Sequence, residues 1–256
     1  MISVRPLRAF SDNYIWLMED GSGKAIVVDP GQADPVMAAL AADKLTLAGI
    51  LVTHHHFDHT GGVASLASTW GCPVFAPENP AIEAVTHRVA AGDCVEVLNC
   101  RFEVLAVPGH TLDHIAYFQS EDPPLVFCGD TLFAGGCGRV FEGTFPMMFE
   151  SLQRLASLPD NTRVYCAHEY TLANLSFAQA VEPGNADLLA RVAHARALRE
   201  ENTPTVPSLL STERLTNPFL RCSQAGVIQG LADAGRSNTG SAQDRFEELR
   251  QWKDSF

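Results

Sequence analysis

Alternating apolar and polar positions at the start of the chain predict short β-strands, which we expect at Val4–Ala9, Tyr14–Glu19 and Ala25–Asp29. The turn-rich segment Asp20–Gly23 precedes the third of them, so the pattern is that of a β-meander. An alanine- and leucine-rich run then predicts a helix from about Asp34 to Asp43. Asp34 is a good N-cap and the proline that follows fits the first helical position.

The middle of the chain continues with an apolar strand, a helix and further short strands. The first strand is expected at Leu47–Thr53 and the helix over Gly61–Trp70. The later strands are expected at 73–76, 93–98, 102–107, 114–119 and Leu125–Cys128. Strands with interspersed helices therefore dominate to about residue 167.

Beyond residue 167 the apolar residues recur at helical spacing, as Leu188, Val192 and Ala195 do. Helices are expected over Thr171–Val181, Ala186–Glu201 and Ala242–Lys253, with a proline-containing linker at 202–208. We therefore expect an α+β protein of two domains, residues 1–167 and an all-helical region of residues 168–256.

Composition narrows the classes of protein. At 256 residues and 46% hydrophobic content the chain can bury a full core. We see no signal peptide or membrane span, and the seven cysteines, odd in number and without a C-x-x-C pair, suit reduced thiols in the cytosol. A net charge of −12 argues against nucleic acid as a partner.

The most informative segment is His54–His59, His-His-His-Phe-Asp-His, which directly follows an apolar strand. Alternate side chains of an extended segment share a face, so His54 and His56 are placed to bind one metal ion while His55 points the other way. Asp58 and His59 then face a neighbouring ion. Imidazole and carboxylate suit zinc, iron or manganese, so the residue types leave the metal identity open.

Three further donors each follow an apolar run: His110 in Pro-Gly-His-Thr, Asp130 in Cys-Gly-Asp-Thr and His168 in Ala-His-Glu. We assign His54, His56 and His110 to one ion. Asp58, His59 and His168 are assigned to the other, and Asp130 bridges the two. Each ion keeps an open position for water.

A single histidine is more often a surface or core group than a ligand. A cluster of this kind is different, because burying so many unpaired polar groups would be costly without a metal. His87 and His194 have no other candidate ligands close to them in the sequence and are expected to be structural. His55 and His114 are expected to support or pack against the ligands.

The segment His54–His59, followed in order by His110, Asp130 and His168, resembles the signature of the metallo-β-lactamase superfamily. Within it the chain is similar to the glyoxalase II family, the hydroxyacylglutathione hydrolases, over nearly its whole length. The matching motifs include Asp12-Asn13-Tyr14, Val28-Asp29-Pro30-Gly31, Gly136-Cys137-Gly138-Arg139, His168-Glu169-Tyr170-Thr171, Asn217-Pro218-Phe219-Leu220-Arg221 and Arg250-Gln251-Trp252-Lys253. The resemblance implies a four-layer αββα sandwich followed by a small helical domain that binds glutathione.

The resemblance also implies the substrate contacts. Arg250 and Lys253, three positions apart on one helix face, are expected to meet the glycine carboxylate of glutathione as partly exposed charges. Arg139 is expected to contact glutathione, and Tyr170 its thiol-bearing portion. Phe141 departs from the family pattern, because some members carry a tyrosine there. The missing hydroxyl donor is worth about 0.5 to 1.5 kcal/mol.

The activity implied is hydrolysis of S-(2-hydroxyacyl)glutathione, chiefly S-D-lactoylglutathione, to glutathione and D-lactate, the second step of methylglyoxal detoxification. Two divalent ions, zinc above iron or manganese, would lower the pKa of a bridging water from about 15.7 towards about 7, which makes the bridging hydroxide the nucleophile. Asp58 has two duties open to it, as a metal ligand and as the acceptor of a proton.

Rival functions remain at this point. A glutathione-persulfide dioxygenase shares the fold with a single iron, and measured oxygen consumption separates it. A class B β-lactamase would be exported, and an RNA-processing metalloenzyme conflicts with the charge of −12. A non-catalytic metal-binding module would show no turnover. The expected partner is a small glutathione thioester, with neither nucleic acid nor membrane, for a cytoplasmic monomer.

Overall fold

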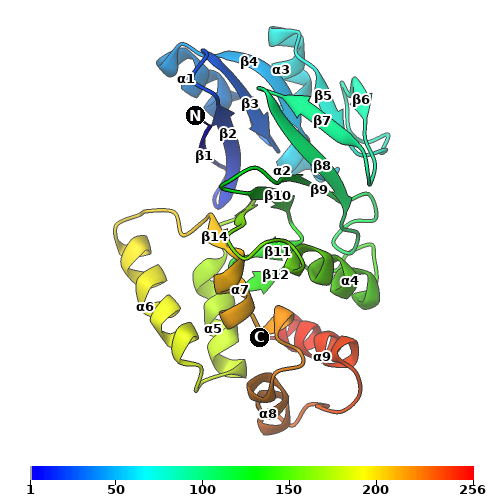
Figure 1. Ribbon diagram of the computed structural model, residues 1–256, viewed down its shortest axis with the longest axis vertical. Helices are drawn as coiled ribbons and strands as arrows, with labels where there is room; N and C mark the ends of the chain where they lie inside the picture. The colour runs from blue at the N-terminus through cyan, green and yellow to red at the C-terminus, as the bar shows by residue number, and fades with distance from the viewer. Residues whose placement is uncertain (1) are drawn as a thin grey trace. The chain divides into compact units, whose positions relative to one another are not determined.

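The computed structural model describes residues 2–256, which divide into two compact units (Figure 1). The first extends to Ala106 and includes Asp113–Gly129, and the second comprises Val107–Leu112 and Asp130–Phe256. The units interleave along the chain, so the domain boundary expected after residue 167 stays a prediction.

The first unit begins with a six-stranded mixed sheet. Its first three strands are an antiparallel meander, as the sequence predicted: β1 (Ser3–Ala9), β2 (Asn13–Glu19) and β3 (Lys24–Val28). The next three, β4 (Thr46–Leu51), β5 (Val74–Ala76) and β6 (His87–Arg88), pair in parallel. Parallel neighbours need a crossover, which α1 (Ala33–Asp43) and α3 (Val63–Trp70) provide.

Helices α1 and α3 cover one face of this sheet, as Figure 1 shows. Val36 and Leu40 of α1 and Leu66 of α3 pack in one cluster with Val27 and Ile50 of the sheet, all at most 1% exposed. The apolar stripe of each helix and the alternating inward positions of the strands together form this core.

A second, antiparallel sheet belongs to the same unit. Its strands lie in the order β10 (Leu125–Gly129), β9 (Ile115–Gln119), β8 (Cys100–Ala106) and β7 (Cys94–Val97). Tyr117 of β9 reaches the first sheet, where its hydroxyl lies 3.0 Å from the carbonyl oxygens of Val52 and of Phe75. The carboxyl end of β4 is thereby fixed, and the histidine-rich loop follows it.

The second unit is mainly helical. It contains two antiparallel strand pairs: the hairpin of β11 (Leu132–Phe133) with β12 (Gly136–Cys137), and β13 (Arg163–Cys166) with β14 (Ser208–Leu209), which is distant in the chain. Its helices are α4 (Phe145–Ala156), α5 (Thr171–Val181), α6 (Ala186–Glu200), α7 (Leu210–Thr216), α8 (Ala225–Asp233) and α9 (Ala242–Asp254), with a short 3-10 helix at Pro218–Leu220.

The helices expected near 171–181, 186–201 and 242–253 are confirmed as α5, α6 and α9. Helix α4 was not expected, although its start carries clear signals. The Thr144 hydroxyl caps it by accepting from the Met147 amide, and Pro146 follows in the first turn. Within residues 2–256, no helix is long and apolar enough to cross a membrane.

Candidate metal centre

The histidine-rich loop of the first unit brings several donor atoms together. It follows β4 and leads into the single-turn helix α2 (Phe57–Thr60), with His54 and His59 almost fully buried. Donor atoms of His54 and His56 lie within 4.8 Å of each other, as do those of His54 and His59 and those of Asp58 and His59. These four expected ligands are thus neighbours in one loop.

Two residues from other segments hold Asp58 in this loop. Asn13, at the start of β2, donates from Nδ2 to Asp58 Oδ2 at 2.9 Å. Gly31 allows the close approach of the backbone, because a Cβ there would lie 1.9 Å from the Asp58 carbonyl oxygen. Asn13 belongs to a motif that the chain shares with the family, but its contact with Asp58 was not predicted from the sequence.

The protonation of His59 follows from its neighbours. Its Nδ1 lies 3.1 Å from Oδ2 of Asp29, and an ionised carboxylate can only accept, so Nδ1 carries the proton. In the neutral ring Nε2 then presents a lone pair, and it lies 3.5 Å from Oδ2 of Asp58. Two acceptor atoms at this distance repel each other unless a cation lies between them.

The second unit repeats this arrangement with the other three expected ligands. Nε2 of His110 lies 3.4 Å, and Nε2 of His168 3.3 Å, from Oδ2 of Asp130. All three residues are buried. His110 Nδ1 lies 2.7 Å from the carbonyl oxygen of Arg139, which only accepts, so the lone pair of His110 Nε2 also faces a carboxylate.

Both sets of donors fit divalent metal ions. Each combines imidazole Nε2 atoms with a carboxylate oxygen, the ligand types of zinc, iron and manganese sites. The opposite imidazole nitrogen is held by a carboxylate or carbonyl in both units, as is usual for metal-binding histidines.

Aromatic side chains lie beside the ligands of the second unit. Tyr170 stacks on His168 with ring centroids 4.7 Å apart, and Phe141 meets His110 edge-on at 5.2 Å. Arg139 lies over the ring of Phe141, 5.5 Å from its centroid. Phe141 is 61% and Tyr170 38% exposed, so both are accessible to a bound molecule.

The basic pair of α9 is less exposed than the sequence suggested. Arg250 is only 5% exposed, which makes the expectation of a partly exposed charge wrong for this residue. Its Nη1 donates to the Cys137 carbonyl oxygen at 3.1 Å and its Nη2 to Asp254 Oδ1 at 3.0 Å. Lys253 is half-buried and donates to the Ala173 carbonyl oxygen at 3.3 Å. Burial, together with the charge of Arg250, lowers the pKa of Lys253.

Two other histidines of the first unit contact the rings of expected ligands, His55 that of His56 and His114 that of His54, and are assigned to neither ion. His55 Nδ1 lies 3.0 Å from Oδ1 of Asp113, and His114 stacks on His54 with centroids 4.5 Å apart. The rings of His87 and Phe75 stack 4.7 Å apart at the parallel edge of the first sheet.

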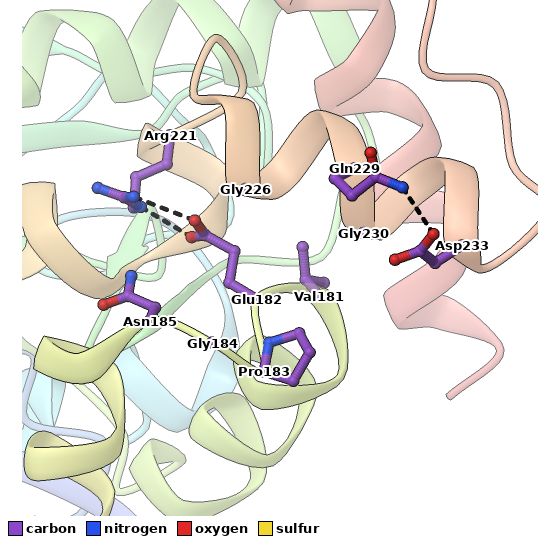
Figure 2. A pocket seen from close by; sticks show the side chains of 10 residues that line it. All are labelled: Val181, Glu182, Pro183, Gly184, Asn185, Arg221, Gly226, Gln229, Gly230 and Asp233. Carbon is purple, nitrogen blue, oxygen red and sulfur yellow. Dashed lines mark hydrogen bonds and ion pairs between the residues drawn. The ribbon is translucent and has the colours of Figure 1, made fainter.

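A cavity of about 520 Å³ lies in the second unit, between the end of α5 and α8 (Figure 2). Its central feature is the ion pair in which Arg221 donates to both Glu182 oxygens, at 2.8 and 3.0 Å. Gly230 of α8 permits close packing there, since a Cβ would lie 1.8 Å from the Val181 carbonyl oxygen. No residue expected in the active site lines this cavity.

Comparison with known proteins identifies the family. A model of the metallo-β-lactamase superfamily matches residues 9–168, and a model of the hydroxyacylglutathione hydrolase C-terminus matches residues 169–256. The hydroxyacylglutathione hydrolase of Chromohalobacter salexigens is 52% identical over the full length of both chains. The chain belongs to the hydroxyacylglutathione hydrolase family. The enzyme of that name from Pseudomonas aeruginosa strain PAO1 is 53% identical, again over both full lengths.

Solved structures agree with this family fold. The crystal structure of ETHE1 from Myxococcus xanthus has a TM-score of 0.67 at 26% identity and covers 99% of each chain. A B3 metallo-β-lactamase, BLEG-1, has a TM-score of 0.64 at 21% identity over 86% of this chain and 99% of its own, and shares the fold. The expected metallo-β-lactamase fold with a helical C-terminal region is therefore confirmed, and with it divalent metal binding in this hydroxyacylglutathione hydrolase family member.

Proposed function

We propose that the protein hydrolyses S-(2-hydroxyacyl)glutathione, chiefly S-D-lactoylglutathione, to glutathione and a 2-hydroxy acid. The observation that carries this proposal is full-length similarity at 52% identity to a hydroxyacylglutathione hydrolase, together with the match of residues 169–256 to the model of the hydroxyacylglutathione hydrolase C-terminus. The single-iron glutathione-persulfide dioxygenase is not favoured, because the Chromohalobacter salexigens and Pseudomonas aeruginosa relatives, which match the whole chain at 52% and 53% identity, carry the hydrolase name.

The metal ligands are proposed as two sets joined by one carboxylate. His54, His56 and His110 hold one ion, and Asp58, His59 and His168 hold the other. Asp130 would contribute its carboxylate to both ions, in keeping with the contacts of its Oδ2 to two imidazoles. The chemistry that two divalent ions, which we propose to be zinc, would supply when bound is activation of water and polarisation of the thioester carbonyl.

Residues of the chain then orient the reactants. Asp58 serves as a ligand and accepts the proton of the attacking water, while the amide of Asn13 keeps the carboxylate in place. Tyr170 and Phe141 offer exposed aromatic surface beside His168 and His110, where the acyl group and the thiol portion of the substrate bind. A thiolate is a good leaving group because thiol pKa values lie far below those of alcohols and amines.

Glutathione is proposed to extend from this surface towards the end of α9, in the helical domain that we place at residues 168–256. Arg139 and Lys253 are the more accessible cations there. Arg250 lies deeper and fixes the carbonyl of Cys137. We place the enzyme in the cytoplasm as a monomer whose partner is this small thioester, with no role for nucleic acid or membranes, in keeping with the net charge of −12.

The proposal is tested with purified, zinc-loaded protein and S-D-lactoylglutathione. Loss of the thioester absorbance and appearance of one free thiol per substrate are the expected results. Oxygen uptake is measured in parallel with glutathione persulfide. Oxygen consumption without thioester hydrolysis assigns the chain to the dioxygenases instead, and metal binding without either reaction makes it a binding protein.

A further inference from the structure

A buried carboxylate outside the proposed ligand set connects two of the ligands. Asp29, at the end of β3, is 4% exposed and has a left-handed backbone, with φ of 53°. This conformation costs energy for any residue other than glycine, although aspartate tolerates it better than most. Asp29 accepts from the Thr53 amide at 2.7 Å and from the Thr53 hydroxyl at 2.8 Å. Its Oδ2 also lies 3.1 Å from Nδ1 of His59.

The hydroxyl of Thr53 connects this carboxylate to His54, because it contacts both residues. The hydroxyl group has one proton, which it must donate to Asp29, since an ionised carboxylate has no proton to donate. Nδ1 of His54 lies 3.1 Å from the same hydroxyl oxygen. Because the hydroxyl proton is donated to Asp29, the contact between Thr53 Oγ1 and His54 Nδ1 is a hydrogen bond only if His54 Nδ1 is the donor. His54 therefore carries its proton on Nδ1 and presents the lone pair of Nε2.

We propose that Asp29 is a positioning residue that sets the tautomer and ring orientation of two metal ligands, His59 directly and His54 through Thr53. Because His54 and His59 are assigned to different ions, one carboxylate prepares both sites for metal. The inference rests on the proposed function only in requiring that these histidines bind metal.

The substitution Asp29→Asn separates tautomer control from folding. Asparagine tolerates the left-handed backbone, and its Oδ1 still accepts from the Thr53 amide. Its Nδ2 is then a donor directed at His59 Nδ1, which favours the tautomer with the proton on Nε2 and opposes metal binding. Metal affinity, measured by competition with a chelator, should fall about 10- to 100-fold for ions at both sites.

Thr53→Val, with Thr53→Ser as its matched control, tests the relay to His54 alone. Valine removes the hydroxyl and serine keeps it, so only valine should weaken metal binding. In zinc-loaded protein labelled with ¹⁵N-histidine, Thr53→Val should alter the Nδ1–H signal of His54 and leave that of His59 in place. Asp29→Asn should alter both signals.

Asp113→Asn is the control for a general disturbance of the loop, because Asp113 contacts His55, which is not a proposed ligand. Its metal affinity should stay within about twofold of wild type. Thermal unfolding of each metal-free variant monitors folding, and Thr53→Val decides the question if Asp29→Asn does not fold. Wild-type affinity in both Asp29→Asn and Thr53→Val, or an equal loss in Asp113→Asn, overturns the inference. A wild-type protein that binds no metal contradicts the proposed function instead.

Discussion

Arg250 donates a hydrogen bond from Nη2 to Oδ1 of Asp254, one turn further along α9, at 3.0 Å. Nε of Arg139 lies 3.8 Å from the same carboxylate oxygen. Asp254 thus partly neutralises Arg250 and Arg139, two of the cations that we propose to contact glutathione. A substrate carboxylate must compete with this resident one.

Neutralising Asp254 should therefore strengthen substrate binding. We expect Asp254→Asn to lower KM for S-D-lactoylglutathione several-fold with kcat nearly unchanged, because the contact is remote from the reacting carbonyl. Steady-state kinetics measure both constants, and a small thioester without a carboxylate serves as the control. A raised KM would mean that Asp254 instead holds Arg250 in its binding position.

Lys253→Ala should raise KM for the glutathione thioester about five- to thirty-fold, which corresponds to about 1 to 2 kcal/mol, and leave kcat nearly unchanged. Arg250→Ala should act in the same direction and also lower the melting temperature, because the buried guanidinium holds the Cys137 carbonyl. The double variant should fall short of the sum, since the two cations share one partner. An unchanged KM in the double variant removes α9 from the substrate site.

Substrate affinity should depend on pH through Lys253. Burial, reinforced by the charge of Arg250, lowers the pKa of this amine. A base with a lowered pKa loses its proton at a lower pH than an exposed lysine does, so KM should begin to rise below the usual lysine range. Lys253→Arg should keep KM low to higher pH, because guanidinium stays charged. Identical KM profiles for the two proteins would exclude Lys253 as the titrating group.

Cys137, between Gly136 and Gly138, is not expected to act as a nucleophile. Burial raises the pKa of its thiol, although the charge of Arg250 opposes the shift, so the protonated form prevails at neutral pH. Cys137→Ser should retain most of kcat. Mass spectrometry of rapidly quenched reactions should show no acylated protein, and an acyl group on Cys137 would overturn the mechanism.

The sequence predicted the fold well where periodicity decides it. The β-meander and helices α5, α6 and α9 follow from alternation and helical spacing. Helix α4 could also have been predicted, because Met148, Leu152 and Leu155 recur at helical intervals and are buried. Helix α7 could not have been predicted from periodicity. Its fully buried Glu213 pairs with Arg191, and this tertiary contact makes a polar segment part of the interior.

The candidate site was also only partly predictable from the sequence. The types and order of the ligands were evident from the motif at His54–His59 and the later donors. The supporting roles of Asn13, Asp29 and Thr53 were not evident, because they depend on contacts between segments distant in sequence. The burial of Arg250 was also hidden, since a charged residue in a charged helix usually indicates a solvated face.

The bridging role of Asp130 predicts unequal effects on metal content. Asp130→Ala should lose more metal than His110→Ala, because Oδ2 of Asp130 contacts imidazoles that we assign to different ions. Elemental analysis of the two variants, purified side by side after expression with added zinc, measures the difference. Equal occupancy in both would count against the bridge.

The most direct test of the account is a zinc titration of metal-free protein, followed by the rate of S-D-lactoylglutathione hydrolysis. Seven proposed ligands are too many for one tetrahedral ion, so activity should rise from background and reach its maximum at about two ions per chain. Full activity at one ion per chain would contradict the paired metal centre. No hydrolysis at any metal content would contradict the proposed function itself.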